Sequence, residues 1–132
     1  MEALKGFERD FTERCREALV NAVRECQSRF PSCAILLSGG VDTAAILDAN
    51  QLLRPESILI ENAVTVMTSD CEAFDRPYAE VVSRRHQLEN HVLVDSPLDT
   101  FFQFAPLCIS SLRTFDGMTL RNSLVIAAVN SL

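Results

Sequence analysis

The sequence lacks the features that mark membrane, secreted and zinc-binding proteins. No apolar run among its 132 residues approaches the roughly 20 residues that a membrane-spanning helix needs. The first ten residues carry five charged side chains and no apolar core, which is unlike a secretory signal peptide. No Cys-x-x-Cys pair and no cysteine–histidine cluster occurs, so neither a zinc site nor a dithiol redox site is indicated. We therefore expect a cytoplasmic protein with no membrane partner.

The cysteines agree with a reducing compartment. They are odd in number, widely spaced and mostly set in apolar patterns, so buried free thiols are the expected state. Two of them fall on the apolar side of an expected N-terminal helix, where we predict that they pack rather than take part in chemistry. The five are Cys15, Cys26, Cys33, Cys71 and Cys108.

Basic residues are too few for nucleic-acid binding. The net charge is −6, and residues 1–30 hold six basic and six acidic groups, so the whole deficit lies in residues 31–132. Phosphate backbones repel such a surface, and nucleic acid is not an expected partner. At 48% hydrophobic residues, the chain has the size and composition of one domain with a real core.

The most informative stretch is an apolar strand that breaks into a glycine turn and then a helix. The run Cys33–Leu37 is typical of a parallel strand covered on both faces. Gly39 and Gly40 allow backbone angles and close approaches that a Cβ would prevent. A helix is expected over Asp42–Leu53. A strand, a turn and a helix start in this order leave backbone N–H groups unpaired at the positive end of the helix dipole, which suits phosphate.

Three side chains in this stretch fit a nucleotide. Ser38 and Thr43 can donate hydroxyl hydrogen bonds to phosphate oxygens, whereas Asp42 would repel a bare phosphate unless Mg²⁺ lies between them. The alternative is an ordinary strand-to-helix turn with Asp42 as the helix N-cap.

The flanking regions predict an α/β architecture. An amphipathic helix over residues 6–29 forms an N-terminal unit within residues 1–31, and the ligand-binding domain covers 32–132. Its apolar stripe consists of Phe7, Phe11, Cys15, Ala18, Leu19, Ala22, Val23 and Cys26.

Strands and helices alternate in the middle of the chain. Strands are expected over Ala63–Thr68 and His91–Asp95, with a helix from Asp75 to Leu88 between them. This order implies a doubly wound parallel sheet with helices on both faces. Residues 57–60 fit either a short strand or the end of the preceding helix, which residues 54–56 stop. We expect Asp75 to be the N-cap of the helix over residues 75–88 and Pro77 to lie in its first turn. The residues that give its helical repeat are Tyr78, Val81, Val82 and Arg85.

The last third is aromatic and helical. Pro106 should kink or restart a helix that begins near Leu98, and Ile109, Leu112 and Phe115 continue an apolar face. We expect His86 on the surface and His91 at a strand edge, with neither assigned to catalysis. No catalytic residue is assigned from the sequence.

The segment Ser38-Gly39-Gly40-Val41-Asp42-Thr43 resembles the SGGxD(S/T) loop of the ATP pyrophosphatase (PP-loop) superfamily. It is not a Walker loop, because no Gly-Lys-Ser/Thr follows. The resemblance implies an adenine nucleotide alpha-hydrolase-like fold. It also implies a reaction in which ATP is split between its α and β phosphates.

Within that superfamily the chain looks most like the synthetase domain of asparagine synthetases. Their D-x-x-Y-A-x-x-V/A spacing, followed by a histidine, matches Asp75, Tyr78, Ala79, Val82 and His91. Their E-x-Y-D-x-x-T-x-R-x-S segment resembles residues 113–123, where the matches are Asp116, Thr119, Arg121 and Ser123 and the departures are Arg113 and Phe115.

The resemblance implies a set of ATP-binding residues, with Asp42 holding Mg²⁺. They are Leu37, Ser38, Gly39, Gly40, Asp42, Thr43, Val66, Met67, Thr68 and Arg121. Backbone groups near residues 66–68 would recognise adenine. Arg121 near a helix N-terminus is unfavourable for the dipole, and either a polyphosphate or substrate carboxylate or a neighbouring acidic side chain would compensate for it.

The implied reaction is adenylation of a small carboxylate with release of pyrophosphate, followed by capture by an amine. In the family a second metal-binding carboxylate and a lysine lie further along. The only lysine here is Lys5, and Glu2 stands where a glutaminase would have its cysteine nucleophile. We therefore expect an incomplete domain, ending within an apolar helix, with weak or no catalysis alone. It could be completed by a missing C-terminal segment, a partner chain or a homo-oligomer. The alternatives are a non-catalytic nucleotide-binding regulatory module and another adenylating enzyme of the superfamily, of the tRNA-modifying or NAD-synthesis type.

Overall fold

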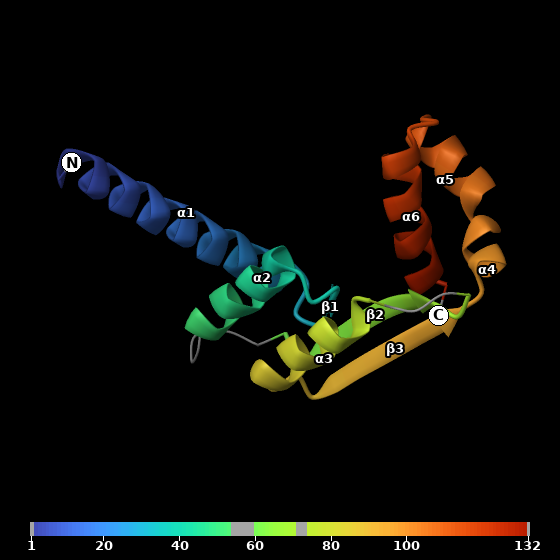
Figure 1. The fold of residues 1–132 in the computed structure, drawn as a ribbon, viewed down its shortest axis with the longest axis horizontal. Helices are drawn as coiled ribbons and strands as arrows, with labels where there is room; N and C mark the ends of the chain where they lie inside the picture. The colour runs from blue at the N-terminus through green and yellow to red at the C-terminus, as the bar shows by residue number, and fades with distance from the viewer. Residues whose placement is uncertain (1, 54–59, 71–73, 132) are drawn as a thin grey trace.

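A parallel three-stranded sheet and six helices make up the part of the chain, residues 2–53, 60–70 and 74–131, that the computed structural model describes (Figure 1). The strands are β1 (Ala34–Leu36), β2 (Asn62–Thr68) and β3 (Asn90–Ser96). The helices are α1 (Glu2–Arg29), α2 (Val41–Leu52), α3 (Arg76–Arg85), α4 (Leu98–Phe102), α5 (Ala105–Leu112) and α6 (Gly117–Val129).

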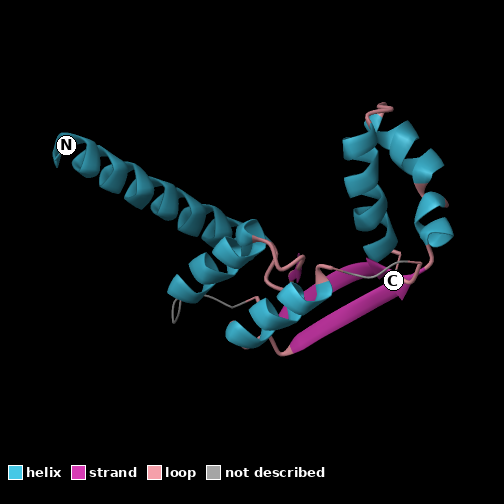
Figure 2. Cartoon of the chain, viewed as in Figure 1, coloured by secondary structure: helices cyan, strands magenta, loops and turns pink. Residues whose placement is uncertain are grey.

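The strand order is β1-β2-β3, and both pairings are parallel. Leu36 pairs with Val64, which in turn pairs with Val92. Helices α2 and α3 are the crossovers between consecutive strands, as parallel pairing requires, and Figure 2 shows the sheet flanked by helices. The predicted α/β class with a parallel sheet is thus confirmed. The main core lies between the sheet and these two helices and contains Ile35, Leu37, Leu47, Ile60, Ala63 and Ala79.

Strand β1 is covered on one face only, which corrects the prediction of a strand buried on both. Ile35 and Leu37 are buried, whereas Ala34 and Leu36, which alternate with them, are exposed. The alternation arises because the described residues pack against a single face of this strand. Cys33, at its start, is half-buried, and burial, helped by Cys26, raises the pKa of its thiol.

Helix α1 buries only part of the predicted stripe, namely Leu19 and Val23, together with residues outside it. Val23 and Gln27 are buried and Leu19 and Val20 half-buried, where the second half of the helix packs on α2. The first half extends away from the body of the protein (Figure 1), and the side chains of residues 8–18 are exposed. The predicted stripe residues that are exposed instead are Phe11, Cys15, Ala18, Ala22 and Cys26; the side chain of Phe7 lies outside the described part.

The packing prediction for Cys15 and Cys26 is therefore wrong, since both thiols are exposed. Cys108 is buried as expected. Cys71 lies outside the described residues. So do residues 54–56, which were predicted to stop the helix, and residues 57–59, for which a short strand and a helix end were the alternatives.

Helix α3 is shorter than predicted. It ends at Arg85 rather than Leu88, because His86 begins a turn in which Gln87 adopts a left-handed φ of 53°. Its inner face is formed by Ala79, Val82 and Ser83. Tyr78, Val81 and Arg85 of the predicted repeat are exposed instead.

The three C-terminal helices stand at the carboxyl end of the sheet (Figure 1). Pro106 lies in the first turn of α5, so the predicted restart at this proline is confirmed. Phe115 lies beyond α5 and is exposed, as is Leu112, so the predicted apolar face does not continue. Helix α6 ends at Val129 with Asn130 as its C-cap, rather than running on as an uncapped helix.

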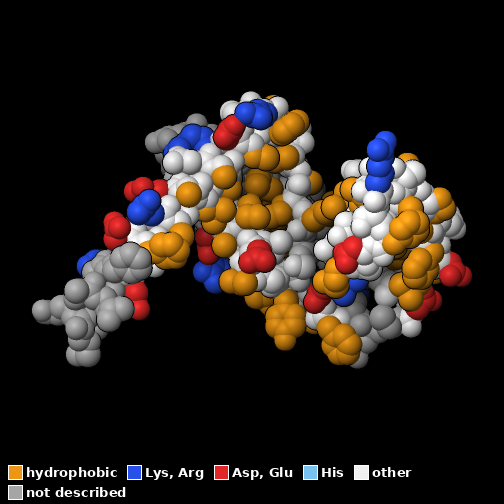
Figure 3. Space-filling model, turned by 90° about the horizontal axis from the view of Figure 1, so that it is seen from above, with side chains coloured by type: hydrophobic (Ala, Val, Ile, Leu, Met, Phe, Trp, Pro, Cys, Tyr) orange, Lys and Arg blue, Asp and Glu red, His pale blue; other side chains and the backbone are white. Residues whose placement is uncertain are grey.

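Apolar side chains gather on the surface of these helices, which form the right-hand lobe in Figure 3. Large exposed examples are Phe102, Leu107, Leu112, Met118 and Ile126. Within the described residues, the search for membrane-crossing helices finds none that is both long and apolar enough.

Candidate nucleotide-binding site

The glycine turn lies between the end of β1 and the start of α2, pressed against the first turn of α3. Gly39 has a left-handed φ of 76°. A Cβ built on it would lie 2.4 Å from the backbone nitrogen of Ala79 and 2.5 Å from the carbonyl carbon of Tyr78. Both the backbone angle and the contact with α3 therefore require glycine here.

Gly40 is the N-cap of α2, and its carbonyl begins the helix. The Ala44 N–H donates to this carbonyl over 3.1 Å and the Thr43 hydroxyl over 3.0 Å. Asp42 is the second residue of the helix, so the alternative that made it the N-cap is wrong. Among the described residues, no side chain caps this N-terminus. The N–H groups of the first turn stay available to an anion, as the turn pattern predicted.

The side chains of the turn are accessible. Ser38 and Asp42 are exposed, and Thr43 is half-buried. The Ser38 Oγ accepts a 3.3 Å hydrogen bond from the Gly40 N–H, which folds the turn back on itself. Helices α2 and α3 both present their first turn here, since both begin at the carboxyl edge of the parallel sheet, and their dipoles add a positive potential around the turn.

Leu37, just before the turn, is held through both of its backbone polar groups. Its N–H donates to the Val64 carbonyl over 2.8 Å, and its carbonyl accepts from the Thr65 hydroxyl over 2.6 Å. The Thr65 Oγ1 also lies 2.7 Å from Nε2 of His91 on β3. Burial lowers the pKa of His91, and the nearby Glu80 carboxylate opposes that shift.

Neither Thr65 nor His91 was among the predicted site residues. Their pairing depends on the β2–β3 register, which sets Ala63 opposite His91 and Thr65 two residues further on the same face. The sequence signal that could have indicated this role is Thr65 itself, a polar β-branched residue between Val64 and Val66 in a mainly apolar strand.

The residues predicted to contact adenine line the same cavity as Arg121. Val66, Met67 and Thr68 at the end of β2 line a cavity of about 640 Å³ together with α4 and α6. The remaining lining residues are Leu98, Phe101, Phe102, Ala105, Gly117, Leu120, Arg121, Leu124 and Val125. The structure thus separates the predicted residues into a turn group, 37–43, and a cavity group, both at the carboxyl edge of the sheet.

The loop after β2 is attached to the helix that walls this cavity. The Asp70 carboxylate accepts hydrogen bonds from the Leu98 N–H at the start of α4 and from the Thr68 hydroxyl. The Asp70 N–H donates to the Thr68 Oγ1 over 3.2 Å. Thr68 is therefore engaged in loop structure, which leaves its backbone as the group available to a ligand.

Helix α6 carries Arg121 and is capped by Asp116. The Asp116 carboxylate accepts from the Thr119 N–H over 2.8 Å, and its hydrogen bonds with Thr119 lower the pKa of Asp116. The Ser123 hydroxyl donates to the Thr119 carbonyl over 2.6 Å. Three of the four residues that match the family segment thus shape the helix start, and Arg121 extends from it, exposed.

The unfavourable position of the Arg121 charge near a helix N-terminus was expected to be offset by an anionic ligand or by a neighbouring acidic side chain. The second of these finds no support. The described residues hold no ion pair between Arg121 and an acidic side chain. An anionic ligand is the alternative that stays open.

Asp75 and His86 differ from prediction in detail. Asp75 is the N-cap of α3 by place, but among the described residues its side chain makes no capping hydrogen bond. His86, predicted on the surface, is buried under α2, with Nε2 3.6 Å from the Asp48 Oδ1. Burial, the main cause, lowers the pKa of His86, Arg85 lowers it further, and Asp48 opposes the shift.

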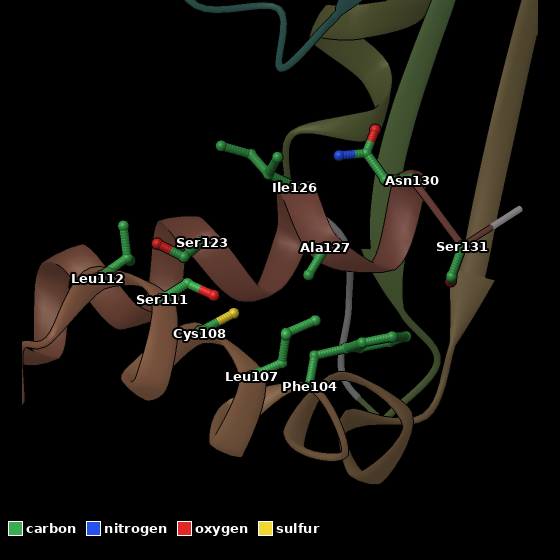
Figure 4. Close-up of a pocket in the computed structure, with 10 residues that line it drawn as sticks. All are labelled: Phe104, Leu107, Cys108, Ser111, Leu112, Ser123, Ile126, Ala127, Asn130 and Ser131. Atoms are coloured by element: carbon green, nitrogen blue, oxygen red, sulfur yellow. The ribbon is translucent and has the colours of Figure 1, made fainter.

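A second cavity, of about 460 Å³, lies between α5 and α6 (Figure 4). Its lining is mainly apolar, and Leu107 of α5 extends toward α6. It holds none of the turn residues, so it is not part of the nucleotide site.

The residues present fit a magnesium–nucleotide complex better than a bare metal. Among the described residues, no group of three or more histidine, cysteine or acidic side chains could hold a metal ion. Mg²⁺ bound to nucleotides takes one or two carboxylates and completes its coordination with phosphates and water. Asp42 is an exposed carboxylate beside the turn and would be the residue to hold such an ion.

Comparison with known proteins gives one match. Residues 14–119 match the protein family described as asparagine synthase, a stretch that contains the glycine turn, the sheet and the cap of α6. Neither the curated proteins nor the solved structures contain a match to the chain. The match covers most of the chain, including the glycine turn, and the protein therefore belongs to the asparagine synthase family.

Proposed function

We propose that the chain binds Mg-ATP at the 38–43 turn as the nucleotide-binding part of an amide-forming ligase. One observation carries this proposal: Gly39, with φ 76° and no room for a Cβ, holds an uncapped helix N-terminus open beside the first turn of a second helix. Family membership supports the same ligand, since asparagine synthases generally use ATP.

The turn group would hold the β and γ phosphates. The backbone N–H groups of Gly39 and of residues 41–43 and the hydroxyls of Ser38 and Thr43 would donate to phosphate oxygens. Mg²⁺, held by Asp42, would neutralise charge on the departing pyrophosphate. Positioning and charge neutralisation are the main physical tasks in such a reaction.

The cavity group would hold the rest of the reactants. Backbone groups of Val66, Met67 and Thr68 would bind adenine, and Arg121 would pair with a polyphosphate or with the carboxylate of the substrate. The carboxylate would attack the α phosphate, forming an acyl-adenylate and releasing pyrophosphate, and an amine would then form the amide. A small carboxylate is thus the proposed substrate, and the acidic surface makes nucleic acid an unsuitable partner.

A second candidate is a regulatory module that binds nucleotide without catalysis. The absence of a metal-binding cluster among the described residues and the absence of any lysine besides Lys5 favour it.

Titration of the ¹⁵N-labelled chain with Mg-ATP tests binding. We expect the amide resonances of Gly39, Gly40 and Thr43 to shift, and those of Ser131 in the α5–α6 cavity to stay unchanged. The Asp42→Asn variant should lose the dependence on Mg²⁺ while keeping its fold, because Asp42 is exposed. Unmoved resonances at residues 38–43 would contradict the proposal.

Exchange of labelled pyrophosphate into ATP separates the two candidates. A ligase supports exchange with a suitable carboxylic acid, and a regulatory module binds ATP without it.

A further inference from the structure

We propose that Thr65 and His91 are positioning residues for the nucleotide-binding turn, acting through the carbonyl of Leu37. The inference rests on the proposed function, because the turn matters only if a phosphate binds there. Thr65 and His91 lie on β2 and β3, outside the 38–43 turn.

Three groups form one hydrogen-bonded chain from β3 to the entry of the turn. Thr65 is only 2% exposed, and its hydroxyl donates to the Leu37 carbonyl over 2.6 Å. Its single proton is thus used, so the 2.7 Å contact with His91 requires Nε2–H of the imidazole to donate to the Thr65 Oγ1. The hydroxyl is then satisfied both as donor and as acceptor.

This chain fixes the peptide unit that leads into the turn. The backbone of β2 holds the N–H of Leu37, and the Thr65 side chain holds its carbonyl. Two residues later, Gly39 passes so close to α3 that an added Cβ would meet backbone at 2.4 Å. A turn with so little clearance needs a fixed direction of entry, because a rotation of the preceding peptide would drive it into α3 or away from it.

The arrangement survives titration of the imidazole. Glu80 on α3 is the charged group that acts on His91. Protonation of His91 occurs at Nδ1 and leaves the Nε2–H donor in place, so the chain of hydrogen bonds keeps its direction. A role in positioning should therefore show little pH dependence, unlike a role as a general base.

The first test uses the unaltered protein. Long-range ¹H–¹⁵N spectra of the histidine rings report which nitrogen carries the proton. We expect His91 to be the Nε2–H tautomer at pH 8. An Nδ1–H tautomer would break the donor sequence and overturn the inference.

The second test compares paired variants without nucleotide. Thr65→Val keeps the shape but removes the hydroxyl, and Thr65→Ser keeps the hydroxyl. We expect Thr65→Val to shift the amide resonances of Ser38, Gly39 and Gly40 and to speed their hydrogen exchange about tenfold. Thr65→Ser should stay near the wild type. His91→Leu should resemble Thr65→Val, and His91→Gln, whose amide can donate as Nε2–H does, should restore the wild-type pattern.

A matched control separates positioning from general loss of stability. Asn50 at the far end of α2 is also buried and accepts hydrogen bonds from Gln27 and from the Ile60 N–H. Asn50→Ala should lower the free energy of unfolding without moving the resonances of the turn. If Asn50→Ala perturbs the turn as much as Thr65→Val, or if Thr65→Val leaves the turn unchanged, the inference is wrong.

Nucleotide titration distinguishes the two possible failures. If the wild type binds Mg-ATP, Thr65→Val should raise the Kd about tenfold and Thr65→Ser less than about threefold. Equal affinities for wild type and Thr65→Val would overturn the inference and leave the proposed function standing. A wild type that does not bind Mg-ATP overturns the proposed function, while the ligand-free spectra still decide whether Thr65 and His91 position the turn.

Discussion

At the scale of single residues, Gly39 has the strictest requirement. Its left-handed φ and its contact with the backbone of α3 both exclude a side chain. Gly117 differs, because a Cβ built there meets no atom of the described residues within 4 Å.

Gly39→Ala should therefore destabilise the fold by about 2 kcal/mol and weaken Mg-ATP binding, because the turn must move away from α3. Gly117→Ala, in the first turn of α6, should be neutral or stabilising by up to about 1 kcal/mol. Urea unfolding of both variants is the measurement. A fully stable Gly39→Ala chain would show that the turn has more room than the structure gives it.

Buried His86 and half-buried His91 make stability depend on pH. The pKa values of His86 and His91 are both lowered in the folded state from an ordinary value of 6.5, mainly by burial. The unfolded chain therefore takes up protons first as the pH falls. Their stability contribution is complete above about pH 6.5 and is lost below it, by at most about 1.4 kcal/mol per pH unit and histidine.

Asp48→Asn tests the sign of this effect. The Asp48 carboxylate raises the pKa of His86 against the effect of burial, so its removal should lower that pKa further. We expect the variant to lose more stability than the wild type between pH 7 and pH 5, as measured by urea unfolding at each pH. His86→Gln should lose less. An identical loss in all three proteins would contradict the assignment.

At the scale of elements, the start of α6 decides where Arg121 lies. Asp116 caps this helix by accepting from the Thr119 N–H, and Arg121 follows two residues later on the wall of the larger cavity. The cap supports the helix and also opposes the unfavourable placement of a cation near its N-terminus.

Asp116→Ala should lower the Tm by about 4 °C and weaken any ligand held by Arg121. Asp116→Asn should retain most of the stability, since asparagine also caps helices well. Because the pKa of Asp116 is lowered in the folded state, the capping carboxylate also makes stability depend on pH. Its contribution to the free energy of unfolding is present above the ordinary pKa of 3.8 and is lost as the pH falls further. Thermal unfolding of the two variants at pH 7 and near pH 3 is the check.

Helix α1 illustrates how an element can be predicted correctly in type while only part of its predicted face is buried. Its helical period was predictable, but the buried line runs along Leu19, Val23 and Gln27 because only the second half meets α2. The contact surface of a helix depends on its neighbour, which a periodic pattern does not specify.

At the scale of the whole molecule, one core joins the sheet to both crossover helices. Leu47 of α2 is fully buried in it, whereas Leu52 of the same helix is 50% exposed. The core also sets the distance between the end of β1 and α3, and hence the shape of the turn.

Leu47→Ala should lower the free energy of unfolding by about 3 kcal/mol, since it leaves a cavity in packed surroundings. Leu52→Ala should cost less than about 1 kcal/mol. Chemical unfolding monitored by circular dichroism gives both values. Similar losses in the two variants would mean that α2 is not packed as described.

The sequence by itself determined the parallel α/β class, the order of the elements, the glycine turn and the family. These features depend on local chemistry: apolar runs of strand length, glycines where a side chain is forbidden, and proline or aspartate at helix starts. Tertiary structure alone decided which faces are buried, that His86 lies under α2, and that Thr65 links His91 to Leu37. Those contacts join residues far apart in the chain, and they exist only because the register of the parallel strands and the packing of the helices bring them together.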